Sequence, residues 1–145
     1  RDPEMSRGLG DVYKRQGIET VLDLLDFDRR LEGVDVVVTG EGATDWQSVF
    51  GKVMQGVGIH CKAHGIPAVA IVGSMGKGAE DIFEYGIESM ITTINGVMTL
   101  PEALDHAEEL YLGAARRLFR MLRAGRKLSV AVNGVNSNDS HKRAE

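Results

Sequence analysis

A short β-branched run is the feature that most constrains what this chain can fold into. Residues 34–39 read Val-Asp-Val-Val-Val-Thr and then break abruptly into Gly40-Glu41-Gly42, followed by hydroxyl and carboxylate side chains. A valine-rich run of this length is typical of a strand covered on both faces, as in a parallel sheet. Open α/β sheets bind ligands at the carboxyl ends of their strands. The run therefore predicts a buried strand with a candidate binding loop directly after it.

Two further apolar runs have the same organisation. Residues 68–72 are continuously apolar and break into the glycine-rich segment 73–78, and residues 89–94 end at an Asn95-Gly96 turn signal. Helices are expected between and around these runs, over 18–31, 49–64, 79–85 (with Gly86 after its end) and 99–125. Strands that alternate with helices predict an α/β fold whose parallel strands are joined by right-handed crossovers. Three strands are few for such a sheet, so we expect it to be incomplete.

The last helix carries the clearest local signals. Thr99 and Glu102 fit a capping box, Pro101 suits the first turn, and Gly125 is expected to end the helix. Apolar residues at helical spacing predict one buried stripe: Leu100, Leu104, Ala107, Tyr111, Ala114, Leu118 and Leu122. The glycines within 49–64 leave two explanations open, close packing on a neighbouring element or close approach of a ligand.

Both ends of the chain differ from its middle. Residues 1–16 have no clear period and resemble translated adapter sequence, although a genuine short leader helix is the alternative. If they replace native sequence, the natural protein begins further upstream. Residues 126–145 are polar and are expected to form a flexible tail. The predicted domain is therefore 17–125.

Composition limits the possible partners. Without the two ends, Lys+Arg falls from 17 to 9 and Asp+Glu from 21 to 16, which leaves a net charge of −7. An acidic domain is a poor partner for nucleic acid, whose phosphates require a basic face. The single cysteine, Cys61, favours a reducing, cytoplasmic setting. No apolar run approaches the roughly 18 residues of a membrane span, so we expect no membrane partner.

The strand ends would bring three loops to one edge of the sheet, residues 40–48, 73–78 and 93–96. Glycine-rich loops can point backbone N–H groups at an anion, and one or two carboxylates are enough to help hold Mg²⁺. Glu41 and Asp45 supply the carboxylates, and Lys52 could meet a phosphate. The side chains suited to a polyhydroxy substrate are Thr39, Thr44, Gln47 and Ser48. Each residue alone has an ordinary structural explanation, and only their density in one loop favours a site.

Other motifs are weaker. Gly40-Glu41-Gly42 lacks the third glycine of a dinucleotide fingerprint, and Gly51-Lys52 is followed by valine rather than by the Ser or Thr of a P-loop. His60, Cys61 and His64 could suggest a metal site, but no HExxH pattern accompanies them. Packing or solvent exposure is favoured for these three residues.

The combination of motifs resembles the bacterial glycerate kinase family. The resemblance rests on the strand followed by Thr39-Gly40-Glu41-Gly42, then Asp45-Trp46-Gln47-Ser48, then Gly51-Lys52, and it covers roughly residues 17–125. It implies a flavodoxin-like or Rossmann-like three-layer α/β/α domain, paired with a second α/β domain. It also implies transfer of the γ-phosphoryl group of ATP to D-glycerate with Mg²⁺.

On this resemblance, chemistry assigns candidate roles. Glu41, Asp45 and Lys52 are the candidate catalytic residues, with Glu41 and Asp45 also as Mg²⁺ ligands. The candidate substrate- or phosphate-binding residues are Thr39, Gly40, Gly42, Thr44, Gln47, Ser48, Gly73 and Ser74. Ala43 stands where the family often has arginine, so a phosphate contact is missing there. The family's N-terminal glycine-rich segments and inserted domain are not in this chain, so we expect little or no activity from it alone.

Two other interpretations remain open. The chain could be a stand-alone flavodoxin-like module that binds a nucleotide or small hydroxy acid without turnover. It could also be a fragment with no independent function, which would unfold with poor cooperativity and aggregate through exposed sheet edges. The sequence indicates neither the oligomeric state nor the choice between 2- and 3-phosphoglycerate as product.

Overall fold

A parallel sheet forms the centre of the molecule. The computed structural model describes residues 17–45 and 52–138, with side chains through residue 128. Its strands are β1 (Val37–Thr44), β2 (Ala68–Met75) and β3 (Ile87–Thr92), and they pair in the order β1-β2-β3 with both pairs parallel. The predicted α/β class with an incomplete parallel sheet is confirmed.

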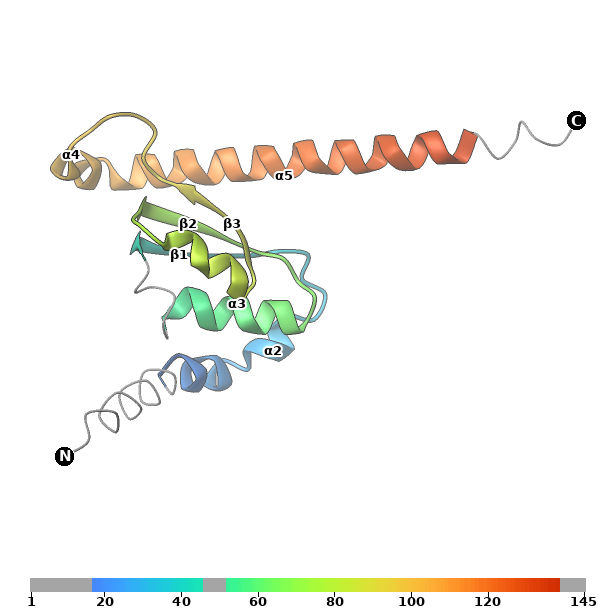
Figure 1. The fold of residues 1–145 in the computed structure, drawn as a ribbon, viewed down its shortest axis with the longest axis horizontal. Coiled ribbons are helices and arrows are strands. Elements are labelled where there is room, and N and C mark those ends of the chain that lie inside the picture. The colour runs from blue at the N-terminus through green and yellow to red at the C-terminus, as the bar shows by residue number, and fades with distance from the viewer. Residues whose placement is uncertain (1–16, 46–51, 139–145) are drawn as a thin grey trace, which may run out of the picture.

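Helices cover both faces of this sheet (Figure 1). On one face lie α3 (Val53–Ala63) and the 3-10 helix η2 (Ala79–Tyr85), and α2 (Phe27–Arg30) packs against α3 farther from the sheet. On the other face lies α5 (Ala107–Asn138), preceded by the short helix α4 (Leu100–Asp105). The layers are therefore helix, sheet and helix, and α5 extends well beyond the end of the sheet.

The side chains of β2 alternate between two apolar clusters, which is why its whole run is hydrophobic. Ala68, Ala70 and Val72 belong to the larger cluster, whereas Val69 and Ile71 belong to the smaller one. The larger cluster also contains Leu22, Leu31, Met54, Val57, Cys61, Ile82 and Ile87, and the smaller one Ala114 and Leu118. A strand buried on both faces is what the valine-rich pattern predicted.

β1 is longer than the sequence predicted. The predicted strand 34–39 is wrong at both ends, because β1 begins at Val37 and continues to Thr44 in pairing with β2. A side chain on Gly40 would place its Cβ 2.0 Å from the carbonyl oxygen of Ile71, and one on Gly73 would lie 2.2 Å from that of Gly42. The glycines thus permit the pairing to continue. β2 likewise extends to Met75, and β3 spans 87–92 rather than 89–94.

The predicted helix over 18–31 is broken. Residues 17–24 are helical, residues 25–26 form a turn, and the chain resumes as α2. Asp26 has φ 50°, a left-handed conformation that no helix interior accepts. Because of this break, Leu22 and Leu31 both belong to the larger apolar cluster, together with the buried residues of α3.

The glycines of α3 are explained by close packing. A Cβ on Gly56 would lie 2.6 Å from the Cγ1 atom of Ile18, and one on Gly58 would lie 2.5 Å from the carbonyl oxygen of Tyr85. The predicted helix over 49–64 begins later, at Val53, and residues 49–51 lie outside the described residues. The short helix over 79–85 is confirmed as η2, and Gly86 follows it with φ 98°.

The last helix begins as predicted but neither stays continuous nor ends as predicted. The amide of Thr99 donates to the carboxylate of Glu102 at 2.7 Å and the amide of Glu102 donates to the Thr99 hydroxyl at 3.4 Å, which completes the capping box. The helix breaks at His106, and α5 then continues past Gly125 to Asn138. The polar segment 126–138 is therefore helical, and 139–145 lie outside the described residues.

Only part of the predicted apolar stripe is buried. Ala114 and Leu118 pack on the sheet, but Leu100 and Leu104 are 72% and 66% exposed. α4 and the first turns of α5 stand beside the strand ends instead of lying on the sheet. Within the described part of the chain, no helix combines the length and apolarity that crossing a membrane requires.

Candidate active site

A groove of about 1160 Å³ runs along most of β1, from Val38 to Ala43, and reaches the second half of β2. One wall consists of these parts of the two strands and the loop after β3, and the other consists of α4 and the start of α5. The residues on the first wall are Val38, Thr39, Gly40, Glu41, Gly42, Ala43, Ile71, Gly73, Ser74, Thr93 and Ile94. Those on the second wall are Met98, Thr99, Leu100, Ala103, Leu104, Ala107 and Tyr111. The part of the groove lined by Gly42, Ala43 and Ser74 lies at the carboxyl edge of the sheet, where open α/β sheets bind ligands.

The groove brings together six of the residues predicted from the sequence: Thr39, Gly40, Glu41, Gly42, Gly73 and Ser74. They meet because β1 and β2 are parallel neighbours, with Glu41 opposite Val72 and Ala43 opposite Ser74. Glu41 is half-buried, and it is the only charged residue among the described residues that line the groove.

The other predicted residues do not line the groove. Thr44 is 1% exposed, and its hydroxyl has no hydrogen-bond partner among the described residues. Asp45 is half-buried beside Gly76, and a Cβ on that glycine would lie 3.1 Å from the Cβ of Asp45. Lys52 is exposed at the start of α3. Gln47 and Ser48 lie outside the described residues.

The groove glycines have different physical roles. Gly40 and Gly73 must lack a side chain for β1 and β2 to pair, as their Cβ distances show. Gly42 has no atom within 4 Å of a Cβ placed on it and no positive φ, so the fold itself does not require glycine there. A glycine with open space above it leaves its backbone accessible to a ligand. Gly42 is therefore the strongest candidate for a backbone contact with a bound group.

The donor set fits a magnesium ion that is held mainly by a ligand's phosphates and by water. Mg²⁺ in phosphoryl-transfer sites keeps several waters and uses only one or two protein carboxylates. Glu41 supplies one such carboxylate in the groove. Among residues 17–45 and 52–128, no three His, Cys, Asp or Glu side chains are grouped to hold a metal ion by themselves. An all-protein metal cage is therefore not a feature of the described chain.

Sequence reasoning missed the helical wall of the groove. Leu104 and Tyr111 were expected to be buried in the apolar stripe, but they line the groove instead. One signal could have indicated this position. The loop 93–96 was expected at the binding edge, and the capped helix starts only a few residues after that loop.

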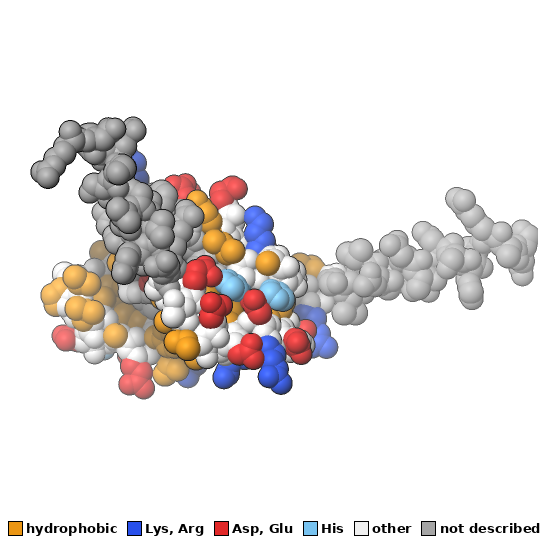
Figure 2. Space-filling view, turned by 90° about the horizontal axis from the view of Figure 1, so that it is seen from below, with side chains coloured by type: hydrophobic (Ala, Val, Ile, Leu, Met, Phe, Trp, Pro, Cys, Tyr) orange, Lys and Arg blue, Asp and Glu red, His pale blue; other side chains and the backbone are white. Residues whose placement is uncertain are grey.

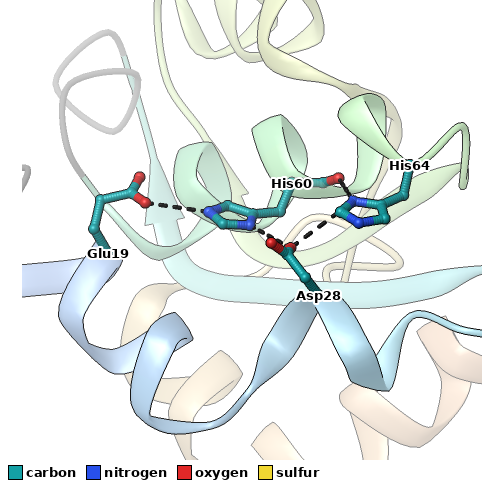
Figure 3. A network of polar contacts seen from close by, with 4 residues as sticks. All are labelled: Glu19, Asp28, His60 and His64. Atoms are coloured by element: carbon teal, nitrogen blue, oxygen red, sulfur yellow. Dashed lines mark hydrogen bonds and ion pairs between the residues drawn. The ribbon is translucent and has the colours of Figure 1, made fainter.

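His60 in α3 and His64 at its C-terminal end form a polar network on the side of α3 that faces α2. His60 contacts two carboxylates, Asp28 through Nδ1 at 2.6 Å and Glu19 through Nε2 at 3.1 Å (Figure 3). The Nδ1 atom of His64 donates to the carbonyl oxygen of His60 at 2.9 Å. Figure 2 shows histidine side chains among Asp and Glu side chains on this face. The network joins the N-terminal helical segments to α3.

The network has predictable protonation behaviour. The hydrogen bond with Asp28 raises the pKa of His60 above its usual value, partial burial opposes this, and Glu19 reinforces it. Burial, with a smaller contribution from Asp28, raises the pKa of the neighbouring Cys61 thiol. Cys61 is 0% exposed, which argues against a nucleophilic role.

Comparisons with known proteins agree on one family. The model of the "Glycerate kinase family" matches residues 9–123. The chain is 39% identical over 102 residues to a glycerate kinase of Halalkalibacterium halodurans, covering 70% of this chain and 27% of the relative. It is 31% identical over 111 residues to the glycerate 2-kinase of Escherichia coli, covering 77% of this chain and 29% of the relative.

A solved structure supports the same likeness. It is a crystal structure from Salmonella typhimurium LT2, provisionally named glycerate kinase 2, and it aligns with a TM-score of 0.56 at 33% identity. The alignment covers 75% of this chain and 27% of the solved one. The chain thus spans between a quarter and a third of the length of the relatives it matches.

Proposed function

The chain belongs to the glycerate kinase family, and on this basis we propose that it forms part of the active site of an ATP-dependent kinase that phosphorylates D-glycerate with Mg²⁺. The observation that carries the proposal is the groove along β1 and β2, which Glu41 and the open backbone of Gly42 both line. The chain's single cysteine agrees with a cytoplasmic setting, which we include in the proposal.

The groove suits phosphoryl transfer because that reaction depends mainly on positioning and charge stabilisation. The backbone of Gly42 is open to an approaching phosphate oxygen. Mg²⁺, when bound with the nucleotide, would neutralise developing charge, and Glu41 would hold it or accept a hydrogen bond from a substrate hydroxyl. Asp45 and Lys52 flank the end of β1 and the start of α3, from which they would act on the phosphates or the metal.

The first experiment uses the complete gene product that contains this segment, identified from the genomic sequence around it. Glu41→Gln removes the charge and keeps the shape of the side chain. We expect glycerate-dependent ADP formation to fall by about 100-fold, as is typical when one group that stabilises the transition state is lost. Asp35→Asn is the matched control, because Asp35 is an exposed carboxylate just before β1 and outside the groove.

Asp45 and Lys52 are tested in the same assay by Asp45→Asn and Lys52→Met. Near-normal turnover in both Glu41→Ala and Asp45→Ala would remove the assigned roles. Because the chain spans only 27% of the Halalkalibacterium relative, we further propose that residues 1–145 alone have little or no kinase activity. Robust glycerate-dependent ADP release by the 145-residue chain would refute that part.

A second candidate function is a binding module without turnover. It is favoured by the groove itself, which is formed by the described residues of this chain alone. Such a module would bind ATP or glycerate without releasing ADP, and the complete gene product would be equally inactive. Glycerate-dependent ADP formation by the complete gene product excludes this alternative.

A further inference from the structure

We propose that the helical wall of the groove binds the uncharged nucleoside part of the phosphate donor, with Tyr111 and Leu104 against the base. The inference rests on the proposed function and adds the location and orientation of the nucleotide. The base would lie against α4 and α5, and the phosphates would point toward Glu41 and Gly42 at the strand ends.

The groove is larger than glycerate alone would fill. At about 1160 Å³ it matches or exceeds the volume of roughly 300–1,000 Å³ typical of pockets for drug-sized ligands. Glycerate has three carbon atoms and would occupy only a small part of it. A nucleotide is the larger of the two substrates, so the groove volume favours the nucleotide as its main occupant.

The two walls of the groove differ in polarity, as do the base and the sugar-phosphate part of a nucleotide. The helical wall is apolar, and it presents Leu104 and Tyr111 with 66% and 51% of their surface exposed. Exposed aliphatic and aromatic side chains on one wall suit the flat face of a base. The strand wall includes three residues that bear hydroxyl groups, Thr39, Ser74 and Thr93, and hydroxyl-bearing residues suit the ribose hydroxyls.

The charge distribution favours this orientation. Glu41 is the only charged residue among the described lining residues, so the described lining of the groove contains no cation. Arg117 follows Tyr111 on α5, but it donates to the carbonyl oxygen of Thr92 at 2.9 Å and does not line the groove. An uncharged nucleoside can therefore enter without repulsion, whereas phosphates beside Glu41 require Mg²⁺ between them.

The test measures adenosine binding to the 145-residue chain by ligand-observed NMR titration without Mg²⁺. Tyr111→Ala and Leu104→Ala should each weaken adenosine binding by about fivefold or more, in line with the strength of base–aromatic stacking and apolar contact. Phe119→Ala is the matched control, because Phe119 is 58% exposed on the same helix but does not line the groove. The exposure of all three side chains means that these variants should fold.

A second titration separates the two ends of the nucleotide. Binding of inorganic tripolyphosphate should require Mg²⁺, should weaken in Glu41→Gln and should be unchanged in Tyr111→Ala. Absence of saturable adenosine binding to the chain, or equal adenosine binding by the chain and its Tyr111→Ala and Leu104→Ala variants, would overturn the inference. So would adenosine binding that is present in the 145-residue chain and lost in the complete gene product, because other parts of the polypeptide would then cover the groove.

The two proposals can fail separately. If the complete gene product forms no ADP with glycerate while Tyr111→Ala still weakens adenosine binding, the proposed function fails and the nucleoside site stands. If the complete gene product is an active kinase and Tyr111→Ala leaves its KM for ATP unchanged, the nucleoside site fails and the function stands.

Discussion

The Nδ1 atom of His60 lies 2.6 Å from the Oδ1 atom of Asp28, and this contact joins α3 to α2 across 32 residues of chain. The His60 side chain is only 17% exposed, whereas that of Asp28 is 53% exposed. The hydrogen bond from His60 lowers the pKa of Asp28, and the hydrogen bond with Asp28 raises the pKa of His60. The pair therefore stabilises the packing of the N-terminal segments on α3 in a pH-dependent way.

The first prediction concerns this pH dependence. The contribution of His60 is complete below its ordinary pKa of about 6.5 and is lost as the pH rises through its raised pKa. The contribution of Asp28 is complete above its ordinary pKa of about 3.9 and is lost as the pH falls through its lowered pKa. Asp28→Asn should therefore lower the melting temperature more at pH 6 than at pH 9.

Thermal denaturation of the 145-residue chain at both pH values checks this prediction. Asp23→Asn is the control, because Asp23 is an exposed carboxylate of the same N-terminal segment. Equal losses in melting temperature at pH 6 and pH 9 for Asp28→Asn would show that the ion pair with His60 contributes nothing measurable.

The second prediction concerns the different effects on stability of substituting Gly40 and Gly42. Gly40→Ala should lower the free energy of unfolding by about 1–3 kcal/mol, because its Cβ would meet the carbonyl oxygen of Ile71 at 2.0 Å. Gly42→Ala should change it by less than about 0.5 kcal/mol, since the space above Gly42 is open. Gly42→Ala should nevertheless weaken Mg²⁺-dependent binding of tripolyphosphate. Urea denaturation and the tripolyphosphate titration measure the two effects, and a strongly destabilised Gly42→Ala variant would contradict the assignment.

The third prediction concerns the core between α3 and the sheet. Met54 is 0% exposed, so Met54→Ala should leave a cavity and lower the free energy of unfolding by about 2–5 kcal/mol. Met121→Ala is the matched control, because Met121 is 66% exposed on α5 and its loss should cost less than about 0.5 kcal/mol. Similar values for the two variants in urea denaturation would mean that Met54 does not pack as described.

The fourth prediction concerns Cys61. Burial raises the pKa of its thiol and withholds it from solvent, so Ellman's reagent at pH 8 should react with it only at the rate at which the protein opens. In denaturant, one thiol per chain should react at once. The control is Ala63→Cys in a Cys61→Ala background, which places the thiol at an exposed position of the same helix. Rapid labelling of native Cys61 would show that α3 does not cover it.

The meeting of the two strand segments could be predicted from local pattern, but the residues that line the groove could not. Thr39, Glu41 and Ser74 line one groove because β1 and β2 are parallel neighbours, and their roles in binding stay predictions. Asp45 and Lys52 were placed in the same site from their short distance along the chain, yet neither lines the groove. Proximity in sequence says little about side chains at a strand end, where each step along the strand reverses the direction of the side chain.

The sequence by itself determined the features that depend on neighbouring residues. The alternation of strands and helices, the two-sided burial of β2 and the capping box at Thr99 and Glu102 follow from periodicity and from hydrogen bonds within one turn. The family resemblance also rests on a short contiguous motif, and the match over residues 9–123 confirms it.

Only the tertiary structure decided the features that depend on residues far apart in the chain. β1 can continue past Gly40 because this residue has no side chain to collide with the carbonyl oxygen of Ile71. The neighbouring strand β2 provides pairing partners as far as Met75. His60 finds its carboxylates 32 and 41 residues away. Tyr111 has the periodicity of a core residue, and it lines a groove because the start of α5 lies beside the strand ends. Periodicity identifies which side chains favour burial, but the packing of the elements decides which of them are buried.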